Sequence, residues 1–234
     1  MNKVEFFELV KSFFPQTSET FFEQVEKYKV FLQEQNKITN LTRLASEEKI
    51  YGDYFFDSII PYKEFDFGKS SVLDIGSGSG IPGVLLKLLF PQITLTIIES
   101  NNKKVDFLNK LKKVLNIEYD VKCKRAEEIT ANESEKFDIA TSRAVARLDV
   151  LIEISTPYLK VGGILIEPKS LNGDFELSCA KNIINVLDVK LINEKKFISP
   201  TQHQEDVFYF KKTKKTPVGY PRKWKDIIKN VKEH

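Results

Sequence analysis

The sequence predicts an α/β protein with a doubly wound, mostly parallel sheet, preceded by a helical N-terminal extension. From Ser70 onward, strand-like apolar runs alternate with helix-length amphipathic segments, as they do in parallel sheets with helices on both faces. A glycine-rich turn joins the first of these strands to the first of these helices, which is typical of nucleotide-binding folds. The first 65 residues instead repeat their apolar side chains at helical spacing.

The N-terminal extension is expected to contain three helices, at 4–14, 18–35 and 46–60. Pro15 ends the first helix, and Asn40-Leu41-Thr42 is expected to break the chain after the second. The second helix carries an apolar stripe that includes Tyr28, which we interpret as a docking face. Because no low-complexity linker follows, we expect residues 1–65 to be packed on the core.

Residues 66–212 are expected to form a Rossmann-like core with seven strands. The predicted strands are 71–75, 93–99, 119–123, 137–141, 163–168, 186–192 and 206–211. The predicted helices between them are 82–90, 101–116, 147–159 and 174–184. In such a sheet, ligands bind at the carboxyl ends of the strands.

Residues 213–234 are expected to form a basic C-terminal tail. Residues 211–234 hold nine lysines and arginines against two acids, a net charge of +7, which leaves −4 for the other 210 residues of a chain whose total is +3. With Tyr220 and Trp224, this segment suits a nucleic-acid phosphate backbone and stacked bases. A frayed, solubilising terminus is the alternative interpretation.

Composition excludes several classes of protein. No run of about 18 apolar residues could span a membrane, and the N-terminus lacks a signal-peptide core. Cys123 and Cys179 are isolated, as expected of reduced cysteines in a cytoplasmic protein. With only His203 and His234, a histidine-based metal centre or catalytic triad is not expected. We therefore expect no metal, no membrane contact and a monomer.

The glycine-rich turn reads VLDIGSGSGIPG at 72–83. Its glycines let a ligand approach the backbone closely. Gly78-x-Gly80-x-x-Gly83 also fits the dinucleotide fingerprint, so the turn alone leaves a nicotinamide cofactor and S-adenosylmethionine open. Asp74 favours the second, because a carboxylate at the strand end would repel a pyrophosphate and attract a sulfonium and an amino group.

Two further acids follow the next strands. Glu99 ends the second strand, 23 positions after Gly76, where an acid can accept hydrogen bonds from both ribose hydroxyls. Lys124-Arg125-Ala126-Glu127-Glu128 follows the third strand, where an acid can receive an adenine amino group. A solvated strand end and a charged loop are the corresponding structural alternatives.

The fourth and fifth strands place two cations at the same edge. Arg143 lies in Thr141-Ser142-Arg143-Ala144, a segment without the Pro-Pro-aromatic run of amino-group methyltransferases or the Pro-Cys of cytosine-carbon enzymes. An arginine there can hold a guanine O6 or a phosphate. Lys169 adds a second cation after the fifth strand. A structural ion pair is the alternative for each.

Taken in order, VLDIGSGSGIPG, IESNNKKVDFL, KRAEE and SRAVA resemble the bacterial ribosomal RNA small subunit methyltransferase G family (RsmG, also called GidB). The resemblance extends from Asn40-Leu41-Thr42 and Asp57-Ser58 to Tyr220-Pro221-Arg222. It implies a class I S-adenosylmethionine-dependent methyltransferase fold and methylation of a guanine N7 in 16S rRNA. The implied partner is 16S rRNA or the small ribosomal subunit particle.

By position, the resemblance also implies roles for individual residues. Gly76, Gly78, Gly80 and Ile81 would bind the methionine and ribose part of the cofactor, Glu99 and Ser100 the ribose, Ala126 and Glu127 the adenine, and Arg143 the boundary with the substrate. Tyr54 stands where many members carry histidine, so no catalytic role is carried over to it. The ending WKDIIKNVKEH departs from the family's Gly/Pro-rich basic terminus.

The residue chemistry agrees with this reaction. Guanine N7 carries a free lone pair, so in-line attack on the sulfonium methyl removes no proton and needs no dedicated general base. Arg143 and Lys169 are the residues we expect to orient the guanine. Two other hypotheses are a nicotinamide-dependent oxidoreductase that uses the same turn, and a non-catalytic RNA-binding or assembly protein that uses the basic tail.

Overall fold

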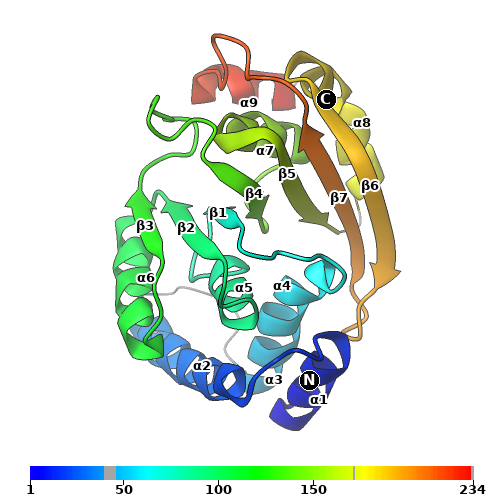
Figure 1. The fold of residues 1–234 in the computed structure, drawn as a ribbon. Coiled ribbons are helices and arrows are strands. Elements are labelled where there is room, and N and C mark those ends of the chain that lie inside the picture. The colour runs from blue at the N-terminus through cyan, green and yellow to red at the C-terminus, as the bar shows by residue number, and fades with distance from the viewer. Residues whose placement is uncertain (40–45, 171, 233–234) are drawn as a thin grey trace.

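A computed structural model of the chain describes residues 1–39, 46–170 and 172–232. A seven-stranded sheet runs through the molecule with helices on both of its faces (Figure 1). The predicted break at Asn40-Leu41-Thr42 lies outside the described residues. The α/β architecture with a mostly parallel sheet is confirmed.

The sheet has the strand order β3-β2-β1-β4-β5-β7-β6. Its strands are β1 (Ser71–Ile75), β2 (Thr94–Glu99), β3 (Asp120–Cys123), β4 (Phe137–Ser142), β5 (Leu159–Lys169), β6 (Val189–Ile198) and β7 (Gln204–Lys212). Among the described pairs, β7 is antiparallel to both β5 and β6, and all other pairs are parallel. The order reverses between β1 and β4, which is where ligands bind in open α/β sheets.

All seven predicted strands are present, but β5 and β6 are longer than predicted. β5 begins at Leu159 instead of residue 163, and β6 ends at Ile198 instead of residue 192. The added part of β6 is mostly exposed and polar, and it is held by antiparallel pairing with β7. An apolar pattern cannot reveal a strand that buries little apolar surface.

The main helices agree with the predicted ranges to within a few residues. They are α1 (Lys3–Phe13), α2 (Glu19–Thr39), α5 (Gly83–Leu89), α6 (Asn102–Leu115), α7 (Leu148–Ser155, followed by the 3-10 turn η3, Thr156–Tyr158) and α8 (Gly173–Val186). Helices α2, α5 and α6 lie on one face of the sheet, and α7 and α8 lie on the other (Figure 1).

The segment predicted as one helix at 46–60 is not regular. It consists of α3 (Glu47–Lys49), the π-helical segment η1 (Ile50–Phe56), α4 (Asp57–Ile59) and the 3-10 turn η2 (Ile60–Tyr62). Within it, the Asp57 N–H donates to the Gly52 carbonyl, which is the wider spacing of a π-helix. This wider turn lets Tyr51, Phe55 and Phe56 all enter the core.

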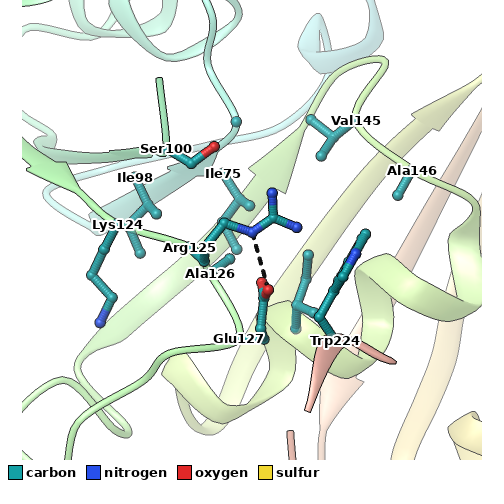
Figure 2. A pocket seen from close by; sticks show the side chains of 12 residues that line it. Ile75, Ile98, Ser100, Lys124, Arg125, Ala126, Glu127, Val145, Ala146 and Trp224 are labelled. Atoms are coloured by element: carbon teal, nitrogen blue, oxygen red, sulfur yellow. Dashed lines mark hydrogen bonds and ion pairs between the residues drawn. The ribbon is translucent and has the colours of Figure 1, made fainter. Parts of the chain in front are cut away.

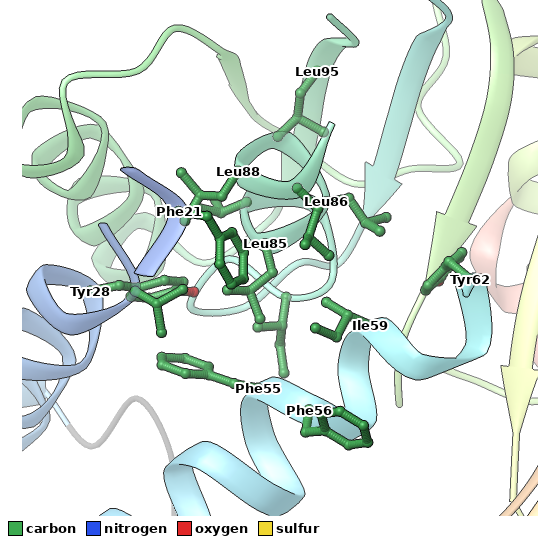
Figure 3. Close-up of a cluster of buried hydrophobic side chains, with 14 of the residues drawn as sticks. Phe21, Tyr28, Phe55, Phe56, Ile59, Tyr62, Leu85, Leu86, Leu88 and Leu95 are labelled. Atoms are coloured by element: carbon green, nitrogen blue, oxygen red, sulfur yellow. The ribbon is translucent and has the colours of Figure 1, made fainter. Parts of the chain in front are cut away.

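The N-terminal helices share one hydrophobic core with the sheet. Phe21 and Tyr28 of α2 and Phe55 of η1 pack in the same buried cluster as Leu85 and Leu86 of α5 (Figure 3). A second cluster fills the opposite face beneath α7 and α8. Successive strand residues alternate between the two clusters, as the pleat requires: Val72 belongs to the first and Leu73 to the second.

The C-terminal segment contains a helix that the sequence did not indicate, α9 (Trp224–Lys232). It lies near α7 at the top of Figure 1. Ile227 is only 2% exposed and belongs to the second cluster.

Cys123 and Cys179 are both free thiols. Within the part of the chain that the structure describes, no helix combines the length and the apolar character needed to cross a membrane.

Candidate functional site

The glycine-rich turn leaves β1 at Ile75 and enters α5 at Gly83. Gly76, Gly78 and Gly80 all have positive φ, at 68°, 62° and 106°. A Cβ on Gly76 would lie 2.6 Å from the Val145 side chain, and one on Gly80 would lie 2.7 Å from the Tyr28 hydroxyl. Conformation therefore disfavours a side chain at all three positions, and space also excludes one at Gly76 and Gly80.

Asp74 lies beneath this turn and is fully buried. Its Oδ2 accepts a hydrogen bond from the Gly83 N–H at 2.8 Å, whereas Oδ1 has no hydrogen-bond partner among the described residues. Burial raises the pKa of Asp74 to about 7. A buried oxygen without a partner is costly, so Asp74 is an unsatisfied acceptor beside a turn built for close backbone contact.

Glu99 ties the turn to the neighbouring strand. It is only 6% exposed, and its two oxygens accept from the Gly78 N–H at 3.0 Å and the Asn101 N–H at 2.9 Å. Asn101 in turn caps α6. Glu99 thus joins the turn, the end of β2 and the start of α6, and each oxygen keeps a second lone pair for a ligand.

Two tyrosines of the N-terminal extension hold the turn from the other side. The Tyr28 hydroxyl donates to the Ser79 carbonyl, and the Tyr54 hydroxyl is hydrogen-bonded to the Ser79 hydroxyl. Burial raises the pKa of both tyrosines. The sequence placed Tyr28 on a docking stripe and gave Tyr54 no role. An apolar pattern shows which side of a helix is buried, but it does not show which groups the tyrosine hydroxyls contact.

A cavity of about 200 Å³, here called the first pocket, opens at the carboxyl ends of β1, β2 and β3 (Figure 2). Its lining residues are Ile75, Gly76, Ile98, Ser100, Lys124, Arg125, Ala126, Glu127, Val145, Ala146, Ile154 and Trp224. Aliphatic side chains form much of the wall. At the mouth, Nε of Arg125 lies 3.1 Å from Oε1 of Glu127.

A larger cavity of about 480 Å³, the second pocket, adjoins β4, β5 and the loop before β7. Its lining residues are Arg143, Ala144, Ala146, Pro168, Lys169, Ser170, Glu176, Gln202, His203, Gln204 and Glu205. Ala146 lines both pockets, so the two cavities lie beside each other at the loop that follows β4. Both lie at the carboxyl ends of parallel strands, where the fold predicts a site.

The two predicted cations lie in the second pocket, each with contacts inside the protein. The Arg143 guanidinium donates to the carbonyls of Asp53 at 2.8 Å and Tyr54 at 3.2 Å, and so is held by η1. Nζ of Lys169 donates to the Ala146 carbonyl at 2.6 Å and pairs with Glu176 at 2.8 Å. Arg143 retains further N–H donors for a ligand.

Two buried carboxyl groups near the second pocket were not singled out from the sequence. Burial raises the pKa of Glu205, a lining residue, to about 7, and the nearby Arg143 opposes this shift. Glu167, on β5, is fully buried and accepts from the Ser142 hydroxyl at 2.8 Å; burial raises its pKa to about 8. No short motif marked either residue.

A group of three potential metal ligands lies beside the second pocket. One ligand atom from each of Asp53, Asp57 and His203 falls within 4.8 Å of the others. Asp57, which is 1% exposed, accepts from the Thr201 hydroxyl and lies 2.5 Å from Nδ1 of His203. Asp57 thereby joins α4 to the loop before β7.

The predicted cofactor residues therefore fall into four places. Gly76, Ser100, Ala126 and Glu127 line the first pocket. Asp74, Gly78, Gly80 and Glu99 form or support the turn. Ile81, at 8% exposure, packs in the N-terminal core, and Arg143 lies in the second pocket.

These residues fit S-adenosylmethionine. The unsatisfied oxygen of Asp74 offers an acceptor for a cationic group, and the glycine turn offers backbone without side chains. The aliphatic walls of the first pocket suit a purine, with Glu127 available to an amino group. Acids at Asp74, Glu99 and Glu127 disfavour a pyrophosphate, because like charges repel in a poorly solvated site.

Comparison with known proteins gives a consistent result. The family model for rRNA small subunit methyltransferase G matches residues 22–204. The Ribosomal RNA small subunit methyltransferase G of Ureaplasma parvum serovar 3 is 45% identical over 98% of this chain and 99% of its own length. That of Lactococcus lactis subsp. lactis is 37% identical over 98% of this chain and 99% of its own.

Solved structures show the same fold at low identity. A SAM-dependent methyltransferase from Aquifex aeolicus superposes with a TM-score of 0.56 at 14% identity, covering 74% of this chain and 97% of that one. P. horikoshii TYW2 in complex with MeSAdo superposes with a TM-score of 0.54 at 15% identity, covering 66% and 61%. The predicted class I methyltransferase fold is thereby confirmed.

Proposed function

Because this chain belongs to the rRNA small subunit methyltransferase G family and is an S-adenosylmethionine-dependent rRNA methyltransferase, we propose how its two pockets perform the transfer to a guanine N7 of 16S rRNA. The observation that supports the proposal is that the two pockets share Ala146 as a lining residue. The methyl donor occupies the first pocket and the guanine the second, with the loop after β4 between them.

The cofactor is held by the end of β1 and the turn that follows. Asp74 serves the cationic groups of the methionine part, Glu99 and Ser100 the ribose, and Ala126 with Glu127 the adenine. Gly76, Gly78 and Gly80 keep the backbone accessible to the ligand. When bound, S-adenosylmethionine supplies an activated methyl group on a sulfonium.

The guanine is oriented by the polar groups of the second pocket. Arg143 offers N–H donors to O6, and Lys169 adds positive charge at the same wall. Glu205 offers a carboxylate to the N1–H and N2 amino donors of the base. Arginine and acid together match the donor and acceptor pattern of guanine and mismatch that of adenine.

The chemistry then depends on alignment. Guanine N7 attacks with its own lone pair, so no side chain has to remove a proton, and none of the acids near the pockets acts as a general base. Near-attack placement supplies ~7–11 kcal/mol in favourable cases. The protein's task is to hold both partners in line and to exclude water.

The RNA contacts extend beyond the pockets. We propose that exposed lysines of the basic tail contact the phosphate backbone and that an exposed loop of 16S rRNA, or of a partly assembled small subunit, presents the guanine. The chain acts in the cytoplasm as a monomer. Family membership argues against the nicotinamide-oxidoreductase and non-catalytic hypotheses.

The deciding experiment is mass spectrometry of 16S rRNA from cells with and without this gene. Deletion should remove a single 7-methylguanosine, and the intact gene should restore it. A gene encoding Arg143→Ala should not restore it, although the protein accumulates. An unchanged 7-methylguanosine content after deletion would contradict the proposal.

A further inference from the structure

The C-terminal helix supplies part of the first pocket. Trp224, the only tryptophan of the chain, begins α9 and lines that pocket. Its ring lies 4.7 Å from the guanidinium carbon of Arg125, another lining residue (Figure 2). The indole is 36% exposed, so one part is covered and another remains free to meet a ligand.

The position of Trp224 is fixed by contacts on both sides of it in the sequence. Before it, Arg222 forms a bidentate pair with Glu153 of α7, at 2.9 and 2.6 Å, and the Arg222 N–H donates to the same carboxylate. Glu153 is only 1% exposed. After it, Ile227 packs in the cluster that contains Ala126 and Ile154, two residues of the pocket wall.

Helix α9 lies near the connection between β3 and β4. Residues 124–136, which connect β3 to β4, contain no helix. That connection supplies Lys124 through Glu127 to the pocket. Trp224 therefore adds an aromatic side chain to a pocket whose other walls are aliphatic or charged.

We propose that Trp224 contacts the adenine of S-adenosylmethionine and, with Arg125 held against its ring, closes the outer side of the adenosine site. The inference rests on the proposed function of the first pocket. A purine and an indole associate through their flat faces and apolar surface, and the cation–π pair with Arg125 keeps the indole in place before the ligand arrives. This assigns to the cofactor an aromatic residue that the sequence pattern associated with RNA.

The first test uses the fluorescence of the intact wild-type chain, in which every tryptophan signal comes from Trp224. Titration with S-adenosylhomocysteine should change the indole emission to saturation. The midpoint should equal the dissociation constant from calorimetry. Normal calorimetric binding without a change in emission would overturn the inference and leave the proposed function intact.

The second test compares variants by calorimetry. Trp224→Ala should weaken S-adenosylhomocysteine about ten-fold, and Trp224→Phe by no more than about three-fold, because most of the stacking surface remains. Lys229→Ala, on the exposed side of the same helix, is the matched control and should bind as the wild type does. Circular dichroism checks that each variant is folded.

The third test separates contact with the base from a general effect on the pocket. 5′-Methylthioadenosine keeps the adenine but lacks the amino acid, so Trp224→Ala should weaken it by the same factor as S-adenosylhomocysteine. Unchanged or tighter binding of both ligands by Trp224→Ala would overturn the inference. Absence of binding to the wild type would instead contradict the proposed function itself.

Discussion

Three carboxyl groups at or near the two pockets are buried and hold their protons unusually strongly: Asp74, Glu167 and Glu205. In each case burial is the largest cause of the raised pKa, because a carboxylate that is poorly hydrated is higher in free energy than the neutral acid. An apolar side chain at these positions would avoid that cost. Their presence at the edge of the sheet that carries both pockets indicates a demand from ligands, which can supply the missing hydrogen bonds or positive charge.

The raised pKa of Asp74 predicts a pH dependence of cofactor affinity. The cationic amino group of S-adenosylhomocysteine favours ionised Asp74, whereas the free protein keeps this group protonated below about pH 7. Binding must then release a proton, so affinity should fall as pH falls through about 7 and level off above it. Calorimetry across this range checks the slope. Asp74→Asn should bind S-adenosylhomocysteine more weakly than the wild type at high pH, and its affinity should no longer change with pH. If the affinity of this variant still falls as pH falls through about 7, Asp74 is not the source of the pH dependence.

Arg143 and Arg147 lie in the same loop, between β4 and α7. Arg143→Lys loses the planar fork that contacts two backbone carbonyls of η1 and, in our proposal, the guanine. Methyl transfer to rRNA should fall by about 100-fold, in line with the loss of one positioned donor. Arg147→Lys retains a cation opposite Asp149 and is the matched control, with activity near that of the wild type. Equal activity of the two variants in a tritiated-methyl assay would remove Arg143 from the site.

Among the elements, those with the strongest apolar pattern were the ones that could be predicted. Strand β1 is buried at four of five positions, and its predicted and observed bounds agree. The π-helical turn of η1 could not be predicted, because its wider spacing follows from packing and not from a residue preference. Helix α9 could not be predicted either, since its basic composition resembles that of a disordered tail and its docking depends on the pair between Arg222 and Glu153, which are 69 residues apart.

Helix α2 and η1 support the glycine turn through the contacts of Tyr28 and Tyr54 with Ser79. Tyr28→Phe removes the donor to the Ser79 carbonyl, which is buried, so the free energy of unfolding should fall by about 1–3 kcal/mol. The turn should also lose order, and S-adenosylhomocysteine should bind about five-fold more weakly, which corresponds to roughly 1 kcal/mol.

Tyr119→Phe is the matched control for this variant. The Tyr119 hydroxyl is also buried and donates to a backbone carbonyl, that of Leu108 in α6, at 2.7 Å. The variant should lower stability to urea without changing affinity for the ligand. A loss of affinity that follows stability equally in both variants would show that Tyr28 has no specific influence on the turn.

At the scale of the whole molecule, the site is assembled from distant parts of the chain. Arg143 reaches the Asp53 carbonyl across 90 residues, and Trp224 contacts Arg125 across 99 residues of sequence. The sequence indicated which strand ends would carry the ligand, because parallel strands share one edge. It could not indicate that the N-terminal extension and the C-terminal helix complete the site, since no local pattern encodes a contact between remote segments.

The cations of residues 211–234, which comprise the end of β7 and the basic tail, are of two kinds. Lys212 is fully buried against the Leu159 carbonyl, and Arg222 is paired with Glu153, so both are structural. Lys211, Lys215 and Lys225 are exposed. If they contact phosphates, their replacement removes attraction to RNA but leaves the first pocket unchanged.

The triple variant Lys211→Gln, Lys215→Gln, Lys225→Gln should therefore raise KM for 16S rRNA without changing the affinity for S-adenosylhomocysteine. The slope of log KM against log salt concentration should decrease by roughly 0.7 for each lysine that contacts a phosphate of single-stranded RNA. The control carries the same three-charge change at exposed positions of α2 and α6, namely Lys37→Gln, Lys110→Gln, Lys113→Gln. Methylation assays at several salt concentrations compare the two. Equal effects would show that net charge alone attracts the RNA; a smaller slope in the tail variant alone would place the phosphate contacts on the tail.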